Sequence, residues 1–175
     1  LGLDLYKRLS VGNQENLVFS PYSVLVALAM TRNGATGETR AEMDQVLHAG
    51  SGDVLDQALN RIDQALAERP GETGDELRNG EVELATANAL WGQQDTPFER
   101  PFLEVLAAQY GAGMKLVDYK TDAERARGDI NTWASDRTNG RIVDLLPPDS
   151  LDSFSRLVLT NAIYFKAPWL KRFSP

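Results

Sequence analysis

Residues 156–173 read RLVLTNAIYFKAPWLKRF, and their first part carries the alternation of a β-strand. Successive side chains of a strand point to opposite faces, so one face holds Leu157, Leu159, Asn161, Ile163 and Phe165. That face is otherwise apolar, and we expect it to lie against the core. A buried amide without a partner costs about 1–3 kcal/mol. The strand therefore predicts an interior polar contact for Asn161.

Residues 16–30, NLVFSPYSVLVALAM, predict a short strand that leads into a buried helix. The strand is expected over residues 17–19. Ser20 is a residue type that caps helices, and Pro21 suits the first helical position. Residues 24–30 are apolar all round, which is typical of a helix enclosed in a core. Ser23 brings a hydroxyl close to that core and needs a partner of its own.

The rest of the chain interleaves helices and strands. Residues 83–91 are mostly apolar or small on both faces, which predicts a central strand in a sheet covered on both sides. Further along, Thr121 and Glu124 have the spacing of a capping box at a helix start. Helices come first and strands alternate with helices afterwards. This order favours an α+β fold, with no convincing boundary between two domains.

Charge and hydropathy exclude two kinds of partner. The chain has 18 basic and 25 acidic side chains, a net charge of −7, and no run of Lys and Arg longer than two residues. Nucleic acid binding needs a clustered basic face, so we expect no nucleic acid partner. The longest apolar run, residues 24–30, is far shorter than the roughly 20 residues that a membrane-spanning helix needs. We expect no membrane partner either.

Catalytic and cofactor chemistry lacks its usual residues. The chain has no cysteine, and its single histidine, His48, lies at the end of a predicted helix. We therefore expect no metal site, no cofactor and no Ser-His or Cys-His nucleophile. Carboxylates such as Asp53, Asp56 and Asp63 are interpreted as solvated helix faces, although a glycosidase pair stays open. The chain is not expected to be an enzyme, and a hydrolase on an unrelated α+β fold is the weakest alternative.

Three segments, in this order, resemble the serpins, a family of serine protease inhibitors. The first has the pattern N-x-x-x-S-P-x-S at residues 16–23. The second, residues 129–147, reads DINTWASDRTNGRIVDLLP and contains I-N-x-W, T-x-G-x-I and D-L-L. The third is TNAIYFKAPW at residues 160–169. The resemblance covers nearly the whole chain and implies a serpin fold, of which these residues supply helices and strands of the central mixed sheet.

The resemblance also implies a mechanism and a set of site residues. In serpins the central sheet accepts a strand from the reactive-centre loop after a target serine protease cleaves that loop, and the protease is trapped as an acyl-enzyme. The matching positions put Ser20, Ser23 and Asn161 in the shutter beneath the opening strands and Trp169 at the breach where insertion begins. We hypothesise that the two hydroxyls and the amide share one polar network, with a partner that this sequence does not supply.

The chain departs from the family in length, because serpins are about twice as long. We therefore expect residues 1–175 to be the N-terminal part of a single serpin domain, with the remaining sheet strands and the reactive-centre loop outside this sequence. Alone, this part would not inhibit a protease. The runner-up is a non-inhibitory serpin that acts as a chaperone or carrier.

The resemblance carries three further expectations. Some serpins bind heparin through a basic helix, but the matching helix here mixes basic with acidic residues, which argues against heparin: Arg61 and Arg69 among Asp53, Asp56, Asp63 and Glu68. The cysteine-free, arginine-rich composition resembles that of prokaryotic serpins, including one from a thermophilic bacterium. The family also implies an extracellular location.

Overall fold

The computed structural model describes residues 1–68, 71–72 and 81–169. Its helices and strands follow one another in the order α1 (Gly2–Ser10), α2 (Pro21–Arg32), α3 (Gly37–Leu47), α4 (Val54–Ala67), β1 (Gly71–Glu72), β2 (Glu81–Gln93), α5 (Arg100–Tyr110), β3 (Gly113–Val117), α6 (Tyr119–Arg137) and β4 (Leu157–Lys166). The expected α+β class is confirmed. None of the described helices is long and apolar enough to cross a membrane.

The sheet is mixed and is organised around β2. β4 runs antiparallel to β2, in register from Gly92 opposite Leu157 to Glu83 opposite Lys166. β3 runs parallel to the last part of β2, from Ala89 opposite Gly113 onward. The short β1 pairs with the start of β2. β2 is thus the central strand, as its two apolar faces predict.

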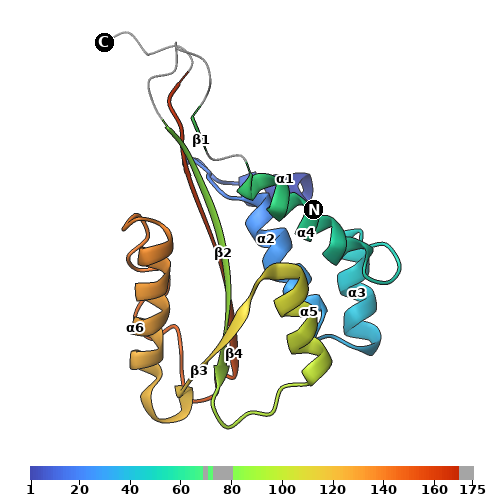
Figure 1. The fold of residues 1–175 in the computed structure, drawn as a ribbon, viewed down its shortest axis with the longest axis vertical. Coiled ribbons are helices and arrows are strands. Elements are labelled where there is room, and N and C mark those ends of the chain that lie inside the picture. The colour runs from blue at the N-terminus through green and yellow to red at the C-terminus, as the bar shows by residue number, and fades with distance from the viewer. Residues whose placement is uncertain (69–70, 73–80, 170–175) are drawn as a thin grey trace.

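Helices cover both faces of this sheet. Figure 1 shows the sheet nearly edge-on, with α6 on one side and α2, α4 and α5 on the other. Each side has its own core: Trp91, Ile130 and Trp133 belong to the α6 side, and Met30, Leu90 and Leu106 belong to the other. Consecutive residues of β2 therefore point into different cores, which is why an alternation of apolar and polar residues is missing there.

Cap and turn residues determine where α2 begins and where α5 ends. The Ser20 hydroxyl oxygen accepts a hydrogen bond from the Ser23 N–H at 3.2 Å, and Pro21 is the first residue of α2, as expected. Gly111 ends α5 with φ = 58°, a left-handed conformation that costs glycine little. That turn leaves the last carbonyl groups of α5 free to accept hydrogen bonds from other elements.

Two local predictions are wrong. Residues 17–19 pair with no strand in the described part of the chain, and Val18 is 93% exposed. The capping box at Thr121 is also wrong, because α6 begins earlier, with Asp118 accepting from the N–H groups of Lys120 and Thr121. The backbone then leaves helical angles at Asp122, whose carboxylate accepts from the Arg125 N–H at 3.1 Å. Aspartate makes both caps, because its carboxylate reaches unpaired N–H groups at a helix start.

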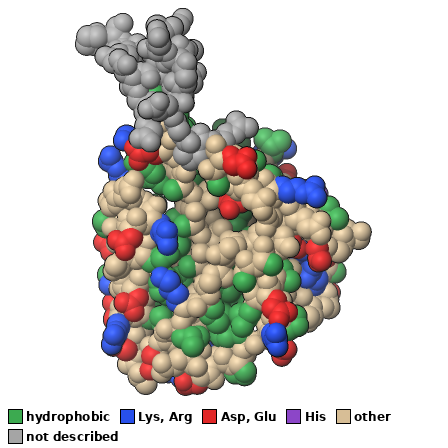
Figure 2. Space-filling model, viewed as in Figure 1, with side chains coloured by type: hydrophobic (Ala, Val, Ile, Leu, Met, Phe, Trp, Pro, Cys, Tyr) green, Lys and Arg blue, Asp and Glu red, His purple; other side chains and the backbone are tan. Residues whose placement is uncertain are grey.

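The visible surface mixes charges of both signs. In Figure 2 apolar side chains gather in the lower middle of this face, where Figure 1 draws β3 and α5, with acidic and basic side chains around them. Leu116 of β3 is one of the exposed apolar residues, at 61%.

Candidate functional site

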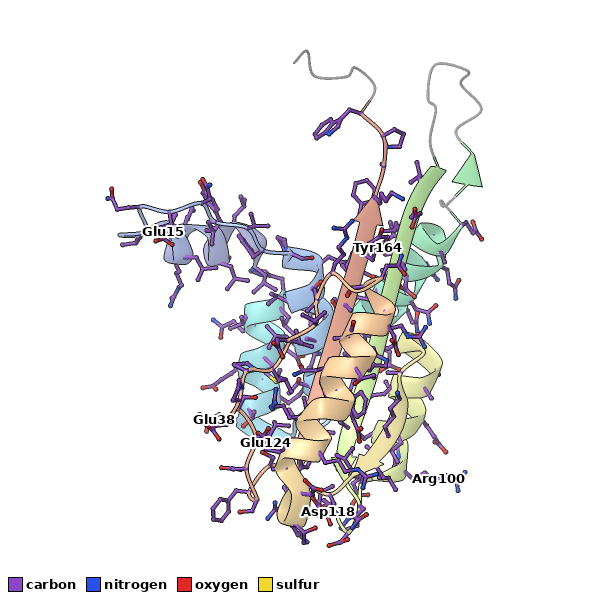
Figure 3. The ribbon with its side chains drawn as sticks, turned by 90° about the vertical axis from the view of Figure 1, so that its left-hand side faces the viewer. Glu15, Glu38, Arg100, Asp118, Glu124 and Tyr164 are labelled. Atoms are coloured by element: carbon purple, nitrogen blue, oxygen red, sulfur yellow. The ribbon has the colours of Figure 1, made fainter. Side chains whose placement is uncertain are left out.

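The outer edge of β4 is the most distinctive feature of the sheet. Within the described residues, β4 pairs with β2 on one side only, over Leu157–Lys166. Figure 3 looks onto the face that α6 covers and shows β4 along one margin of the sheet, β2 in the middle and β3 along the other margin. A long edge strand presents backbone N–H and C=O groups to which another strand can add. This edge can therefore accept a strand.

Two asparagine side chains form a cross-strand pair beneath this edge. Asn161 of β4 lies directly opposite Asn88 of β2. The Asn161 Nδ2 donates to Asn88 Oδ1 at 2.8 Å, and Asn88 Nδ2 donates to the backbone carbonyl of Tyr110 at 3.3 Å. The Asn161 Oδ1 is buried and accepts no hydrogen bond from the described residues. The expected interior contact of Asn161 thus exists for its nitrogen but not for its oxygen.

The face of Asn161 is the one expected from the strand pattern. Leu157 and Leu159, which share that face, pack against the core of the α2 side. The opposite face is covered as well, since Thr160 and Ala162 are buried beneath α6. Asn88 escaped sequence analysis because its neighbours in the chain are apolar or small, so a polar residue at that position carried no periodic signal.

The structure brings α2 and β4 into contact, and with them the elements that carry the predicted shutter residues. Ser20 and Ser23 are both partly buried, at the start of α2. Their mutual hydrogen bond is the helix cap, and no hydrogen bond among the described residues joins either serine to Asn161. Trp169 lies beyond the end of β4 and is 73% exposed. The single polar network of three residues stays a prediction.

On the opposite face, α6 is held against the sheet by a buried aromatic pair. The rings of Trp91 and Trp133 meet edge to face, with centroids 6.2 Å apart. The Trp91 Nε1 donates to Thr160 Oγ1 at 3.0 Å, and that hydroxyl donates to the Ala89 carbonyl at 3.2 Å. Tyr119 donates its hydroxyl to the Trp91 carbonyl, and burial raises the pKa of Tyr119 to about 12. These contacts hold α6 against β2 and β4.

Motif residues in α6 and just after it tie the connecting loop back to the helix. Asn131 donates to the Leu146 carbonyl at 2.9 Å and accepts from the Leu146 N–H at 2.8 Å. Thr138 accepts from the Ile142 N–H at 3.0 Å while its own hydroxyl donates to the Ala134 carbonyl. Gly140 between them has φ = 72°. The I-N-x-W and T-x-G-x-I patterns are therefore structural elements that hold the loop leading to β4.

The helical layer contains a buried ionic cluster that sequence analysis missed. Arg32 is 1% exposed and pairs with Asp44 and, at 3.2 Å, with Asp56. Asp56 is fully buried and also accepts from Asn33 Nδ2 at 2.7 Å and from the Tyr110 hydroxyl. Buried charges are tolerated when they are paired and hydrogen-bonded in this way.

This cluster corrects the interpretation of Asp56 as a residue of a solvated face. α4 turns Asp56 toward Arg32, while Asp53 stays exposed at the helix start. The hydrogen bond from Arg32 holds the pKa of Asp44 below its usual value, and burial together with the Asp56 carboxylate raises the pKa of Tyr110. A basic residue at the end of an apolar helix, followed by acids on the next two helices, is the only sequence signal of this cluster.

The described residues contain no group of three or more His, Cys, Asp or Glu that could hold a metal ion. His48 caps the C-terminus of α3 through its backbone N–H, at the helix end where it was expected. At β4 the structure offers backbone groups for strand pairing and one buried hydrogen-bond acceptor, the Asn161 Oδ1.

Comparison with known proteins places this geometry in a family. The family model described as "Serpin (serine protease inhibitor)" matches residues 1–175. An uncharacterised serpin-like protein of Thermococcus kodakarensis is 38% identical over 97% of this chain and 38% of its own length. A protein of Xenopus tropicalis named leukocyte elastase inhibitor is 34% identical over 97% of this chain and 43% of its own length. The chain thus spans less than half the length of these curated relatives.

The match to a solved structure likewise covers nearly all of this chain and less than half of the related protein. A cleaved ovalbumin mutant, solved in a loop-inserted form, superposes with a TM-score of 0.84 and 29% identity, covering 99% of this chain and 47% of the ovalbumin chain.

Proposed function

The chain belongs to the serpin family, and from that premise we propose that the complete protein inhibits a serine protease by loop insertion. In this mechanism the protease's catalytic serine attacks the scissile carbonyl of the reactive-centre loop, the amine leaving group departs with a proton, and an ester to the protease remains. The cleaved loop then enters the sheet as a new strand and carries the acyl-enzyme with it. This chain contributes the sheet that receives the strand.

The family match over residues 1–175 supports the proposal most directly, and β4 offers a long strand with which the entering loop can pair. The ladder of β4 with β2 runs from Leu157 to Lys166, and the described residues leave its other side unpaired. An edge of this length gives an added strand many backbone hydrogen bonds. The name of the Xenopus relative supports protease inhibition, and the loop-inserted form of the ovalbumin relative supports the insertion step alone.

We further propose that residues 1–175 form the N-terminal part of a single serpin domain, which agrees with the share of its relatives that the chain spans. The remainder of the chain would supply the other sheet strands and the reactive-centre loop. Ser20, Ser23 and Asn161 would then belong to the shutter, and Trp169 to the breach. The free group of Asn161 is an acceptor, Oδ1. The partner from the remainder must therefore be a hydrogen-bond donor.

The non-inhibitory alternative predicts a different fate of the loop. A chaperone or carrier of this family would be cleaved without trapping the protease. Denaturing intact-mass analysis of the complete protein after incubation with trypsin-like, chymotrypsin-like and elastase-like proteases separates the two. A covalent species with the summed mass of inhibitor and protease supports inhibition and identifies the class of target. Cleaved protein with no adduct for any of the three would overturn the inhibitory proposal.

Other expectations remain proposals. No heparin site is proposed on α4, because exposed Asp53 and Glu68 flank exposed Arg61, whereas buried Asp56 does not contribute to the surface charge. Arg69 lies outside the described residues. The bacterial, thermophilic origin and the extracellular location rest on the resemblance, and the archaeal relative supports a prokaryotic affinity. No catalytic role is proposed for the chain itself.

A further inference from the structure

The buried ionic cluster and the asparagine pair are joined by a continuous path of contacts. Asp56 accepts from the hydroxyl of Tyr110, the last residue of α5. The backbone carbonyl of the same Tyr110 accepts from Asn88, and Asn88 accepts from Asn161. The path leads from the helical layer to the edge strand and stops at the Asn161 Oδ1, which has no partner among the described residues.

The Tyr110 carbonyl fixes the direction of the two hydrogen bonds that the asparagines make on this path. A carbonyl oxygen only accepts, so the group of Asn88 that faces it must be Nδ2. Asn88 Oδ1 then faces β4 and must receive a donor, which makes Nδ2 the group that Asn161 turns toward β2. Reversing Asn88 would set two oxygens against each other and two amide nitrogens against each other. The free atom of Asn161 is consequently the acceptor.

The position of that carbonyl is itself fixed from the helical layer. Tyr110 ends α5 where Gly111 takes φ = 58°, so its carbonyl lies outside the regular helix ladder. Tyr110 is 6% exposed, and its hydroxyl is anchored on Asp56, which Arg32 at 3.2 Å and Asn33 at 2.7 Å also hold. A tyrosine hydroxyl is protonated at neutral pH, and burial and Asp56 raise the pKa of Tyr110 further, so its hydroxyl is the donor to Asp56.

We propose that Asn88, Tyr110 and Asp56 are positioning residues for Asn161: they present its Oδ1 to the donor that arrives with the rest of the sheet, and they couple the helical layer to the opening of the β4 edge. This inference rests on the proposed function, because that function supplies the event in question, the entry of a strand beside β4. The orientation of the Asn161 amide is a property of the folded protein and is measurable without any protease.

Tyr110→Phe is the sharpest variant, because it removes only the hydroxyl bond to Asp56 and keeps the ring and the backbone carbonyl. Tyr119→Phe is the matched control, since Tyr119 is also buried and its hydroxyl donates to the Trp91 carbonyl at 3.0 Å on the other face of the sheet. Asn88→Ala is a second variant, which removes the acceptor of Asn161 directly and needs no change in the ionic cluster.

The first readout is hydrogen exchange of the Asn161 side-chain amide, followed by NMR in the complete protein with ¹⁵N-labelled asparagine. We expect Tyr110→Phe to speed this exchange about three- to tenfold, which corresponds to the loss of one buried hydrogen bond, here that of the hydroxyl to Asp56. Asn88→Ala should speed the exchange more, because it removes the acceptor of Asn161 itself. Tyr119→Phe should leave it unchanged. Equal exchange in wild type and Tyr110→Phe, or an equal increase in Tyr119→Phe, would overturn the inference.

The second readout is the rate at which the complete protein forms the covalent protease complex. Tyr110→Phe and Asn88→Ala should change this rate, whereas Tyr119→Phe should not. If the wild type forms no complex, the proposed function fails, while the exchange measurement still decides the inference. If the wild type forms the complex and the exchange is insensitive to Tyr110, the inference alone fails.

Discussion

At the scale of single residues, the Thr160 hydroxyl both accepts and donates a buried hydrogen bond. It accepts from the buried indole of Trp91 at 3.0 Å and donates to the Ala89 carbonyl. Thr160→Val keeps the shape of the side chain but leaves the Trp91 N–H without a partner, so we expect a loss of about 1–3 kcal/mol in unfolding free energy, measured by urea denaturation. Thr132→Val is the control, because Thr132 is exposed and its hydroxyl bonds only within α6. Equal losses would contradict this role of Thr160.

Asp44 gives the fold a predictable response to acid. Its pKa is lowered in the folded state, first by the hydrogen bond from Arg32. A lowered folded pKa contributes stability that is present above the unfolded value, near pH 4, and is lost as the pH falls below it. Asp44→Asn should therefore lose less stability than wild type between pH 7 and pH 3, as followed by urea midpoints. The exposed Asp129, changed to Asn, serves as the control, and an unchanged pH response in Asp44→Asn would contradict the assignment.

At the scale of elements, α6 and its following loop act as one unit because of Asn131. Asn131→Ala removes both hydrogen bonds to Leu146, each contributing about 1 kcal/mol, and should open the loop more often. Limited trypsin cleavage at the exposed Arg141 measures that opening, since cleavage tracks the population of the open form. We expect faster cleavage in the variant.

Asn60→Ala is the matched control for that experiment. The Asn60 amide bonds two backbone carbonyls, of Ala108 and Gln109, each at 3.0 Å, and joins α4 to α5 on the far side of the sheet. Its removal should leave cleavage at Arg141 unchanged. A similar increase in both variants would mean that general destabilisation, rather than the loop contact, controls the cleavage.

The elements themselves were largely readable from the sequence, because their signals are local. Ser20-Pro21 marks the start of α2, and Gly111 marks the end of α5, since cap and turn residues act on their neighbours. The apolar faces of residues 83–91 placed β2 at the centre of the sheet. Residues 17–19 failed as a strand because a short apolar run does not specify a pairing partner.

The site was only partly readable, because its contacts join residues that are far apart in the chain. Asn161 stood out as a polar residue in an apolar strand, but its partner Asn88 lies on another strand and is set by register. Asp56 was interpreted as a surface charge and Arg32 drew no prediction, since a single helix does not reveal that a neighbouring helix buries its polar residue. Long-range pairing of polar groups is decided by tertiary packing, which periodicity does not encode.

At the scale of the whole molecule, the sheet is covered on both faces, and within the described residues β3 and β4 each pair with β2 on one side only. α6 covers one face and α2, α4 and α5 cover the other, while the described part of the chain leaves the β4 edge without a strand. The burial of both faces stabilises the layers, and the edge keeps its hydrogen-bonding capacity. A strand that pairs with β4 adds backbone hydrogen bonds to a sheet whose faces are already covered.

Strand addition beside β4 predicts how cleavage of the reactive-centre loop changes the thermal stability of the complete protein. If the cleaved loop enters beside β4, it adds a ladder along a strand that spans Leu157–Lys166. Several backbone hydrogen bonds at about 1 kcal/mol each should raise the thermal unfolding midpoint by more than about 10 °C. Calorimetry of the cleaved and uncleaved protein, incubated identically, measures the difference. A midpoint that does not rise would show that the edge takes up no strand and would favour the non-inhibitory alternative.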